Sequence, residues 1–216
     1  MIWSTLQAQI DTRQELLELP YLEHLIDDQI DICVITEIWL NNLDPTIISD
    51  LNREGYIFKP FPRSRKGGGL AISYRDTIDI KQLDSSEEDL PFEYVHWRVT
   101  ANHFSFSLIG VYHPPPSATN KTTNQQFIDK LAEILMPIAT EQRNVVILGD
   151  FNIHVNDQDD LDNILLQDWL EASGLINHVT FPTHISGNTL DLVLTKQQQS
   201  LHVLSTQQGI SFFRSF

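Results

Sequence analysis

The chain has 216 residues, 41% hydrophobic and 20% charged, a composition that fits one globular domain and excludes a disordered or membrane-embedded chain. Its net charge of -15 argues against a protein that holds nucleic acid mainly through clustered Lys and Arg, whereas carboxylates could bind a metal. The single cysteine, Cys33, lies in an apolar run, which excludes an intramolecular disulfide and a cysteine-based zinc cluster.

We therefore expect a single domain over residues 1–216. The N-terminus lacks a basic segment followed by an apolar one, so we expect an intracellular protein, and we expect it to be a monomer without contact to membranes.

The first half of the chain predicts a helical segment followed by strands. Apolar residues recur at helical spacing from Asp11 to Asp28, and Pro20 divides this segment into two short helices. Ile30 to Thr36 is typical of a buried strand, with Glu37 at its carboxyl end. Further strands are predicted at Tyr56 to Phe61, Leu70 to Tyr74, Ile78 to Leu83, Tyr94 to Thr100 and Phe104 to Tyr112.

The loop from Pro62 to Gly69 joins the two strands of a predicted hairpin. Its three consecutive glycines, residues 67–69, invite comparison with a phosphate cradle, but no Gly-Lys-Ser/Thr follows, and a hairpin loop is the better interpretation. Arg63, Arg65 and Lys66 form a compact basic cluster, which could contact phosphate or be solvated surface charge.

The second half of the chain predicts two amphipathic helices around a central strand. The helices span Gln126 to Ala139 and Leu161 to Ala172. Val145 to Leu148, between them, predict a strand buried on both faces that ends at Gly149.

Three polar residues, Asp150, Asn152 and His154, follow this strand at alternate positions. If the backbone stays extended, all three project to one side and form a site at the carboxyl end of the strand. Gly-Asp-x-Asn also makes good turns, so a site and a turn are both open interpretations.

Asp191 lies inside the last predicted strand, Thr189 to Thr195. An unpaired buried carboxylate is costly, so this side chain needs a histidine, a metal or hydrogen-bond donors as a partner. Alternatively, it faces solvent from a half-exposed strand.

Five segments, each weak alone, occur in one order over about Asp11 to Thr195. They are Thr36 to Leu40, Gly67 to Ile72, Tyr112 to Pro115, Gly149 to His154 and Thr183 to Val193. Together they make the chain resemble an endonuclease/exonuclease/phosphatase domain, of the kind found at the front of non-LTR retrotransposon polyproteins. The resemblance implies an α/β, four-layered sandwich of two mixed sheets flanked by helices. It also implies hydrolysis of phosphodiesters in DNA, with Mg²⁺, or Mn²⁺ as an alternative, as the cofactor.

The resemblance also implies a role for seven residues. Glu37 would bind Mg²⁺, and Tyr112 would contact the phosphate or the transition state. Asp150 would activate the attacking water, and Asn152 would orient the phosphate or the nucleophile. Asp191 would hold the imidazole of a late histidine, and His154 and Thr189 would line the same groove. The chemistry is consistent, because an anionic phosphodiester needs a cation to absorb charge, and a positioned carboxylate can take a proton from water.

Two elements of the family pattern are not found. Met1 to Gln7 shows no equivalent of the opening strand with its asparagine, and Leu201 to Phe216 lacks the closing Ser-Asp-His triplet, since His202 comes too early. We therefore expect the first and last family strands to be lacking, with open sheet edges and no imidazole for Asp191.

Three functions follow from these observations. The first is a retrotransposon-type endonuclease that nicks DNA, with nuclear localisation inferred from that substrate. The second is an inactive remnant of that domain, and the third is a phosphoesterase of the same fold that acts on another substrate, such as an inositol phosphate. The stretch from Thr183 to Asp191 favours the first over the third.

Overall fold

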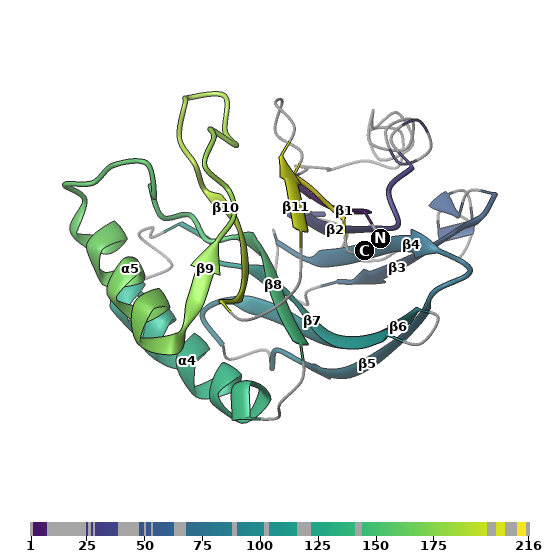
Figure 1. The fold of residues 1–216 in the computed structure, drawn as a ribbon, viewed down its shortest axis with the longest axis horizontal. Coiled ribbons are helices and arrows are strands. Elements are labelled where there is room, and N and C mark those ends of the chain that lie inside the picture. Colours follow the sequence, from purple (N-terminus) through teal and green to yellow (C-terminus); the bar gives the residue numbers. More distant parts are fainter. Residues whose placement is uncertain are drawn as a thin grey trace.

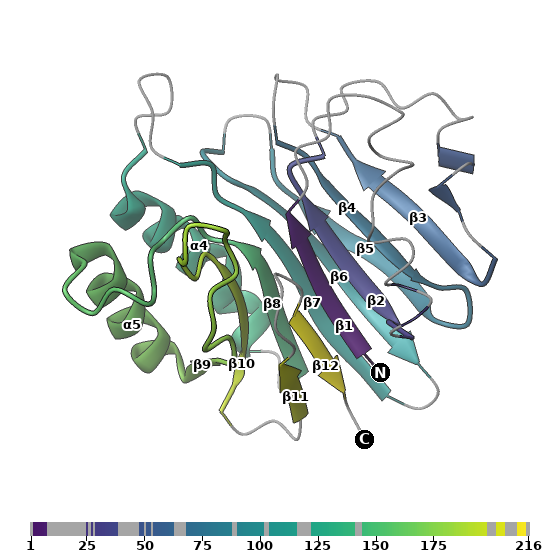
Figure 2. The ribbon, with the colours of Figure 1, turned by 90° about the horizontal axis from the view of Figure 1, so that it is seen from above.

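The computed structural model describes residues 2–7, 25, 27, 29–38, 48–49, 51–52, 54–62, 68–87, 90–101, 104–115, 122–140, 144–197, 202–205 and 211–214. In this part of the chain, the strands form two six-stranded sheets that face each other (Figures 1 and 2). Sheet 1 has the order β11 (His202–Ser205), β12 (Ser211–Arg214), β1 (Ile2–Gln7), β2 (Ile32–Thr36), β4 (Leu70–Arg75), β3 (Tyr56–Phe61). Sheet 2 has the order β5 (Asp79–Ser85), β6 (Glu93–Ala101), β7 (Phe104–Tyr112), β8 (Asn144–Asp150), β10 (Asp191–Lys196), β9 (Leu175–Asn177).

Two hydrophobic cores hold the layers together. The first fills the space between the sheets, where Val34 of β2 and Trp97 of β6 are among its fully buried side chains. The second lies between sheet 2 and the helices α4 (Asn124–Thr140) and α5 (Leu161–Ser173), with Phe127 and Leu170 among the residues that the helices contribute (Figure 1). Sheet 2 is therefore covered on both faces, which explains why its central strand is apolar on both sides.

The predicted sandwich of two mixed sheets is confirmed, and so are both amphipathic helices, as α4 and α5. The predicted helices between Asp11 and Asp28 lie outside the described residues apart from Leu25 and Asp27, and the basic cluster of the predicted hairpin loop lies outside them as well. None of the described helices is long and apolar enough to span a membrane.

The expectation that the first and last strands are lacking is wrong. β1 lies inside sheet 1, parallel to β2 on one side and antiparallel to β12 on the other, and β11 continues the sheet beyond β12. Short strands with mixed polarity are stabilised by their neighbours in the sheet, so local pattern alone does not reveal them.

The prediction that Gly149 ends the central strand is also wrong, because β8 continues through Gly149 to Asp150. Parallel pairing with β7 places Tyr112 beside Asp150, and antiparallel pairing with β10 places Asp191 on its other side. The end of β8 therefore brings three polar side chains from three adjacent strands to one edge of sheet 2.

Gly149 permits this arrangement through its lack of a side chain. Its φ is +145°, and a Cβ atom there would lie 1.8 Å from the carbonyl oxygen of Val111. We expect Gly149→Ala to lower the free energy of unfolding by more than about 3 kcal/mol, because backbone would have to move. Gly187→Ala is the control: its φ is also positive, at +86°, but nothing lies within 4 Å of the added atom.

The measurement is urea unfolding of both variants beside the parent chain. The control should lose only about 1 to 2 kcal/mol, from its left-handed backbone. Equal losses in the two variants would contradict the steric account of Gly149.

Candidate active site

Glu37 lies directly after β2 and points into the protein. Its side chain is 5% exposed, and its φ is +59°, which non-glycine residues seldom adopt. The Tyr112 hydroxyl donates a hydrogen bond of 2.5 Å to Glu37 Oε1 across the gap between the two sheets. The other carboxylate oxygen, Oε2, is buried without a hydrogen-bond partner.

Asp150 and Asn152 form a hydrogen-bonded unit at the end of β8. The Asn152 backbone N–H donates to Asp150 Oδ1 at 2.9 Å, and the Asn152 carboxamide donates to Asp150 Oδ2 at 3.1 Å. The same carboxamide nitrogen donates to the His113 carbonyl oxygen at 2.7 Å. Asn152 has a φ of +50°, so the backbone turns at this residue instead of staying extended.

Asp191 begins β10 opposite Asp150. At 4% exposure it is buried, so the alternative that it faces solvent is wrong. The Thr183 hydroxyl oxygen accepts hydrogen bonds from the backbone N–H groups of Leu190 and Asp191, both at 3.0 Å, which fixes the start of the strand. Asp191 Oδ1 is buried without a hydrogen-bond partner.

Burial and neighbouring charges disfavour the ionised forms of Asp150 and Asp191. Burial and the charges of Asp191 and Glu37 raise the pKa of Asp150 well above its usual value. Burial, with a further contribution from Glu37, raises the pKa of Asp191 to about 6. Burial and hydrogen bonding to Glu37 also raise the pKa of the Tyr112 hydroxyl, which therefore stays protonated and acts as a donor. The site is an acidic cluster that lacks a compensating positive charge among the described contacts of these residues.

A divalent cation fits this cluster chemically. Two buried carboxylate oxygens, Glu37 Oε2 and Asp191 Oδ1, have no hydrogen-bond partner and could face a cation. The described residues contain no cluster of three or more His, Cys, Asp or Glu side chains arranged to hold a metal. Mg²⁺ does not require one, because it commonly binds one or two carboxylates and completes its octahedron with water.

His154 and Thr189 lie apart from these contacts. The His154 side chain is exposed, and its Nδ1 lies 3.7 Å from Asp160 Oδ2. The Thr189 hydroxyl donates to the Phe181 carbonyl oxygen at 2.9 Å, so it is already engaged within the protein. Their assignment to the groove stays a prediction, which no described contact supports.

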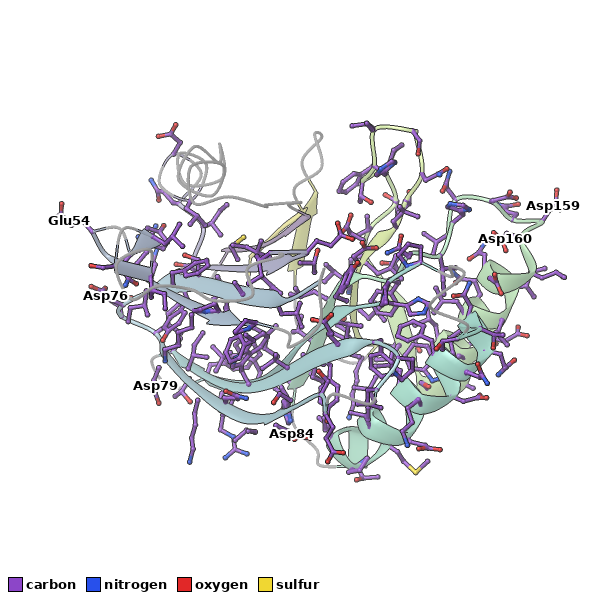
Figure 3. The ribbon with its side chains drawn as sticks, turned by 180° about the vertical axis from the view of Figure 1, so that it is seen from behind. Glu54, Asp76, Asp79, Asp84, Asp159 and Asp160 are labelled. Atoms are coloured by element: carbon purple, nitrogen blue, oxygen red, sulfur yellow. The ribbon has the colours of Figure 1, made fainter. Side chains whose placement is uncertain are left out.

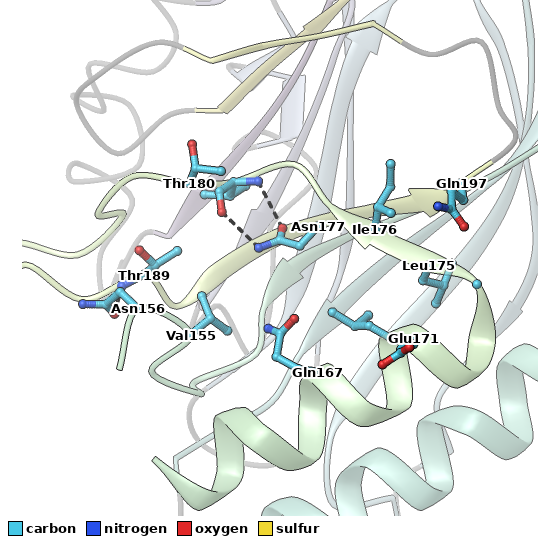
Figure 4. Close-up of a pocket in the computed structure, with 13 residues that line it drawn as sticks. Val155, Asn156, Gln167, Glu171, Leu175, Ile176, Asn177, Thr180, Thr189 and Gln197 are labelled. Atoms are coloured by element: carbon cyan, nitrogen blue, oxygen red, sulfur yellow. Dashed lines mark hydrogen bonds between the residues drawn. The ribbon is translucent and has the colours of Figure 1, made fainter. Parts of the chain in front are cut away.

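Thr189 instead lines a cavity of about 700 Å³ between α5, β9, the segment before α5 and the segment after β9 (Figure 4). Two of its carboxamides are engaged within the protein: Asn156 bonds the backbone of Thr189 and Gly187, and Asn177 bonds the backbone of Val179. These amides stabilise the loops around the cavity, so we assign the cavity no role in the chemistry.

His113 belongs to the Tyr112 to Pro115 segment, and neither the sequence pattern nor the resemblance gives it a role. It is fully buried, stacks on Phe127 of α4 with ring centroids 4.0 Å apart, and accepts the Asn152 hydrogen bond through its carbonyl oxygen. Its ring Nδ1 lies 3.0 Å from the Phe151 carbonyl oxygen, which can only accept, so Nδ1 carries the proton. Burial lowers the pKa of the ring, so His113 acts as a neutral support for the Asp150 to Asn152 segment. The one feature of the sequence that could have pointed to His113 is its position directly after Tyr112.

The closing triplet remains without an equivalent. β12 begins at Ser211, and the residues that follow are Phe212 and Phe213 rather than Asp and His. The side chains of this strand lie outside the described residues. An imidazole partner for Asp191 therefore stays unidentified in the described part of the chain.

We expect Asp191→Asn to stabilise the chain above pH 6 when chelator is present. The carboxyl pKa is about 6 in the folded state against an ordinary value of 3.8, so the folded state binds more protons and loses stability as pH rises between these values. The variant escapes this loss, and its advantage should grow from zero below pH 4 to at most about 3 kcal/mol above pH 6.

Urea unfolding between pH 3.5 and pH 8 measures this difference, with Asp168→Asn, at an exposed position on α5, as the control. A stability difference between Asp191→Asn and the parent chain that does not change with pH would show that Asp191 is not held in a costly ionised form.

Comparison with known proteins supports the fold and the family. Solved structures that resemble this chain include a 3′ phosphatase from Neisseria bound to a product DNA hairpin, with a TM-score of 0.69 and 18% identity over 100% of this chain and 99% of that chain. Another is an AP endonuclease from Archaeoglobus fulgidus, with a TM-score of 0.67 and 14% identity over 100% of this chain and 99% of that chain. A mannosyl-6-phosphatase from Bacteroides thetaiotaomicron has a TM-score of 0.64 and 14% identity over 94% of this chain and 87% of that chain.

At these identities the structures establish the fold alone, and no curated protein sequence matches the chain. The sequence profile of the Endonuclease/Exonuclease/phosphatase family matches residues 8–208, almost the whole chain. Since the match includes every segment that builds the acidic cluster, the chain belongs to the endonuclease/exonuclease/phosphatase family.

Proposed function

We propose that the protein is a Mg²⁺-dependent phosphodiester hydrolase that nicks DNA, of the retrotransposon endonuclease type. The observation that carries this proposal is the acidic cluster of Glu37, Asp150 and Asp191 at the edge of sheet 2, with Tyr112 and Asn152 bonded to two of its members. A buried cluster of carboxylates, in which the pKa values of Asp150 and Asp191 are raised, is typical of a site built for a cation and for proton transfer.

Glu37 and, through its unpartnered oxygen, Asp191 would hold the cation, which when bound offsets the negative charge of the phosphoryl oxygens. Asp150 is suited to take a proton from the attacking water, because its raised pKa brings it closer to neutral pH, where a general base is most effective. Both N–H donors of the Asn152 carboxamide are engaged, one by Asp150 and one by His113, which favours Asn152 as the residue that orients this base.

Tyr112 has its proton directed at Glu37 Oε1. In this arrangement it positions the metal-binding carboxylate, and contact with the phosphate would require the proton to swing away. The hydrogen bond therefore favours a positioning role for Tyr112 over the contact with the phosphate or the transition state that the resemblance implies.

DNA as the substrate is supported by two of the structurally similar proteins, of which one is bound to a product DNA hairpin and one is an AP endonuclease. The net charge of -15 opposes general attraction to DNA. Figure 3 shows that several acidic side chains lie at the outer margin of the molecule: Glu54, Asp76, Asp79, Asp84, Asp159 and Asp160. The retrotransposon type rests on the segment from Thr183 to Val193, which in the structure forms the turn that fixes Asp191.

The alternative substrate is a soluble phosphate ester. The acidic composition would disfavour binding of a polyanion such as DNA more than binding of a small phosphate ester. In addition, a mannosyl-6-phosphatase shares the fold. The other alternative is an inactive remnant, which the missing Ser-Asp-His triplet supports.

We expect Glu37→Ala and Asp150→Ala each to lower the rate of plasmid nicking in Mg²⁺ by about 100-fold or more, because members of such a site act together. Glu54→Ala, which removes an exposed carboxylate, is the control and should keep the parent rate. Nicking that survives both substitutions, or that persists in chelator, would rule out this site as its source.

The substrate class is tested with the same purified chain on supercoiled DNA, on mannose 6-phosphate and on an inositol phosphate. The proposal expects kcat/KM to be highest for DNA. Faster turnover of a soluble ester would reassign the substrate, and no turnover of any of them by a folded chain would establish the remnant.

A further inference from the structure

We propose that Glu93 is a positioning residue that holds Glu37 in place for the cation, by anchoring Gly69 across the two sheets. This inference rests on the proposed function, in which Glu37 binds a divalent cation. Glu93 belongs to none of the segments that carry the family resemblance.

Glu93 lies where the two sheets meet. It is the first residue of β6, is 8% exposed, and pairs in register with Tyr112 of β7, whose hydroxyl donates to Glu37. Its Oε2 accepts a hydrogen bond of 2.8 Å from the Gly69 backbone N–H. Because Gly69 directly precedes β4 of sheet 1, this contact ties the edge of sheet 2 to the segment beside Glu37.

Gly69 in turn determines where the chain runs after β2. The antiparallel pairing of Thr36 with Leu70 places Gly69 opposite Glu37, and the Ile38 N–H donates to the Gly69 carbonyl oxygen at 3.3 Å. At its φ of +95°, a Cβ on Gly69 would lie 2.9 Å from Ile38 Cγ1, so the two segments are in close contact. A shift of Gly69 would therefore shift Ile38 and, with it, the backbone of Glu37.

The backbone of Glu37 needs such support. Its positive φ is a conformation that a glutamate keeps only where the surroundings impose it. Contacts act on this residue from both sheets: Tyr112 fixes the carboxylate, and the link from Glu93 through Gly69 to Ile38 fixes the main chain. Outer contacts of this kind orient metal ligands in many proteins, and their loss weakens metal affinity.

Glu93 could act by geometry or by charge, and two substitutions separate these effects. Glu93→Gln keeps an oxygen that can accept from Gly69 but removes the charge. Glu93→Asp keeps the charge but shortens the side chain, so that the carboxylate no longer reaches the Gly69 N–H. The proposal assigns the effect to geometry, whereas a purely electrostatic role would give the opposite ranking.

The experiment is titration of Mn²⁺ into the metal-free chain, with free Mn²⁺ measured by electron paramagnetic resonance. We expect Glu93→Asp to weaken Mn²⁺ affinity by about 10- to 100-fold, and Glu93→Gln to stay within about threefold of the parent chain. Gly69→Ala, which disturbs the same link, should resemble Glu93→Asp. Glu37→Ala should abolish this binding and so locates the ion.

Tyr94→Phe is the matched control, because it removes a hydrogen bond of 2.7 Å to Asp84 from the next residue of the same strand. Thermal unfolding accompanies each titration, and a merely structural role would lower stability in the control and in Glu93→Asp alike without a change in Mn²⁺ affinity. Parent affinity in Glu93→Asp, or an equal loss in Glu93→Gln, would overturn the proposal for Glu93. Mn²⁺ binding that is unchanged in Glu37→Ala would instead overturn the proposed metal site, and this inference with it.

Discussion

Mutual repulsion of buried carboxylates is the constraint on which this structure depends. Glu37 comes from sheet 1, and Asp150 and Asp191 come from adjacent strands of sheet 2, so both sheets must meet closely for the cluster to exist. Burial of like charges costs folding free energy unless a cation or protons compensate them. The two cores, between the sheets and beneath the helices, supply the stability that sustains this cost.

The surrounding contacts restrict movement of the cluster. Tyr112 bonds Glu37, Asn152 bonds both oxygens of Asp150, and Thr183 fixes the backbone of Asp191. Two of the residues involved, Glu37 and Asn152, have positive φ angles, and such conformations concentrate at functional sites. These contacts hold the carboxylates in place without a ligand, and such preorganisation is what the proposed electrostatic catalysis requires.

The positions of Glu37 and Asp150 in the acidic cluster could be predicted from the sequence alone, because each follows an apolar strand directly or after one glycine. An apolar run followed by Glu37, and another followed by Asp150, are local patterns that need no knowledge of distant contacts. The errors arose where distant contacts decide. Gly149 alone predicts the end of a strand, yet β8 continues through it, paired with Val111 of β7, whose backbone leaves no room for a side chain there. β1 was missed because its strand state depends on pairing with β2 and with β12, far away in sequence.

Glu93 illustrates the same limit. It directly precedes the predicted strand Tyr94 to Thr100, and only the fold shows that its carboxylate turns inward to Gly69. His113 likewise gains a role only when its carbonyl oxygen is seen to receive the Asn152 carboxamide.

The central claim is that Glu37 and Asp191 enclose a divalent cation in an endonuclease/exonuclease/phosphatase fold. The most direct test is a crystal structure of the chain soaked in Mn²⁺, with anomalous scattering used to locate the ion. The account predicts one anomalous peak within bonding distance of Glu37 Oε2. A clear map of an ordered Glu37 without such a peak, at a concentration that saturates Mn²⁺ binding in solution, would contradict it.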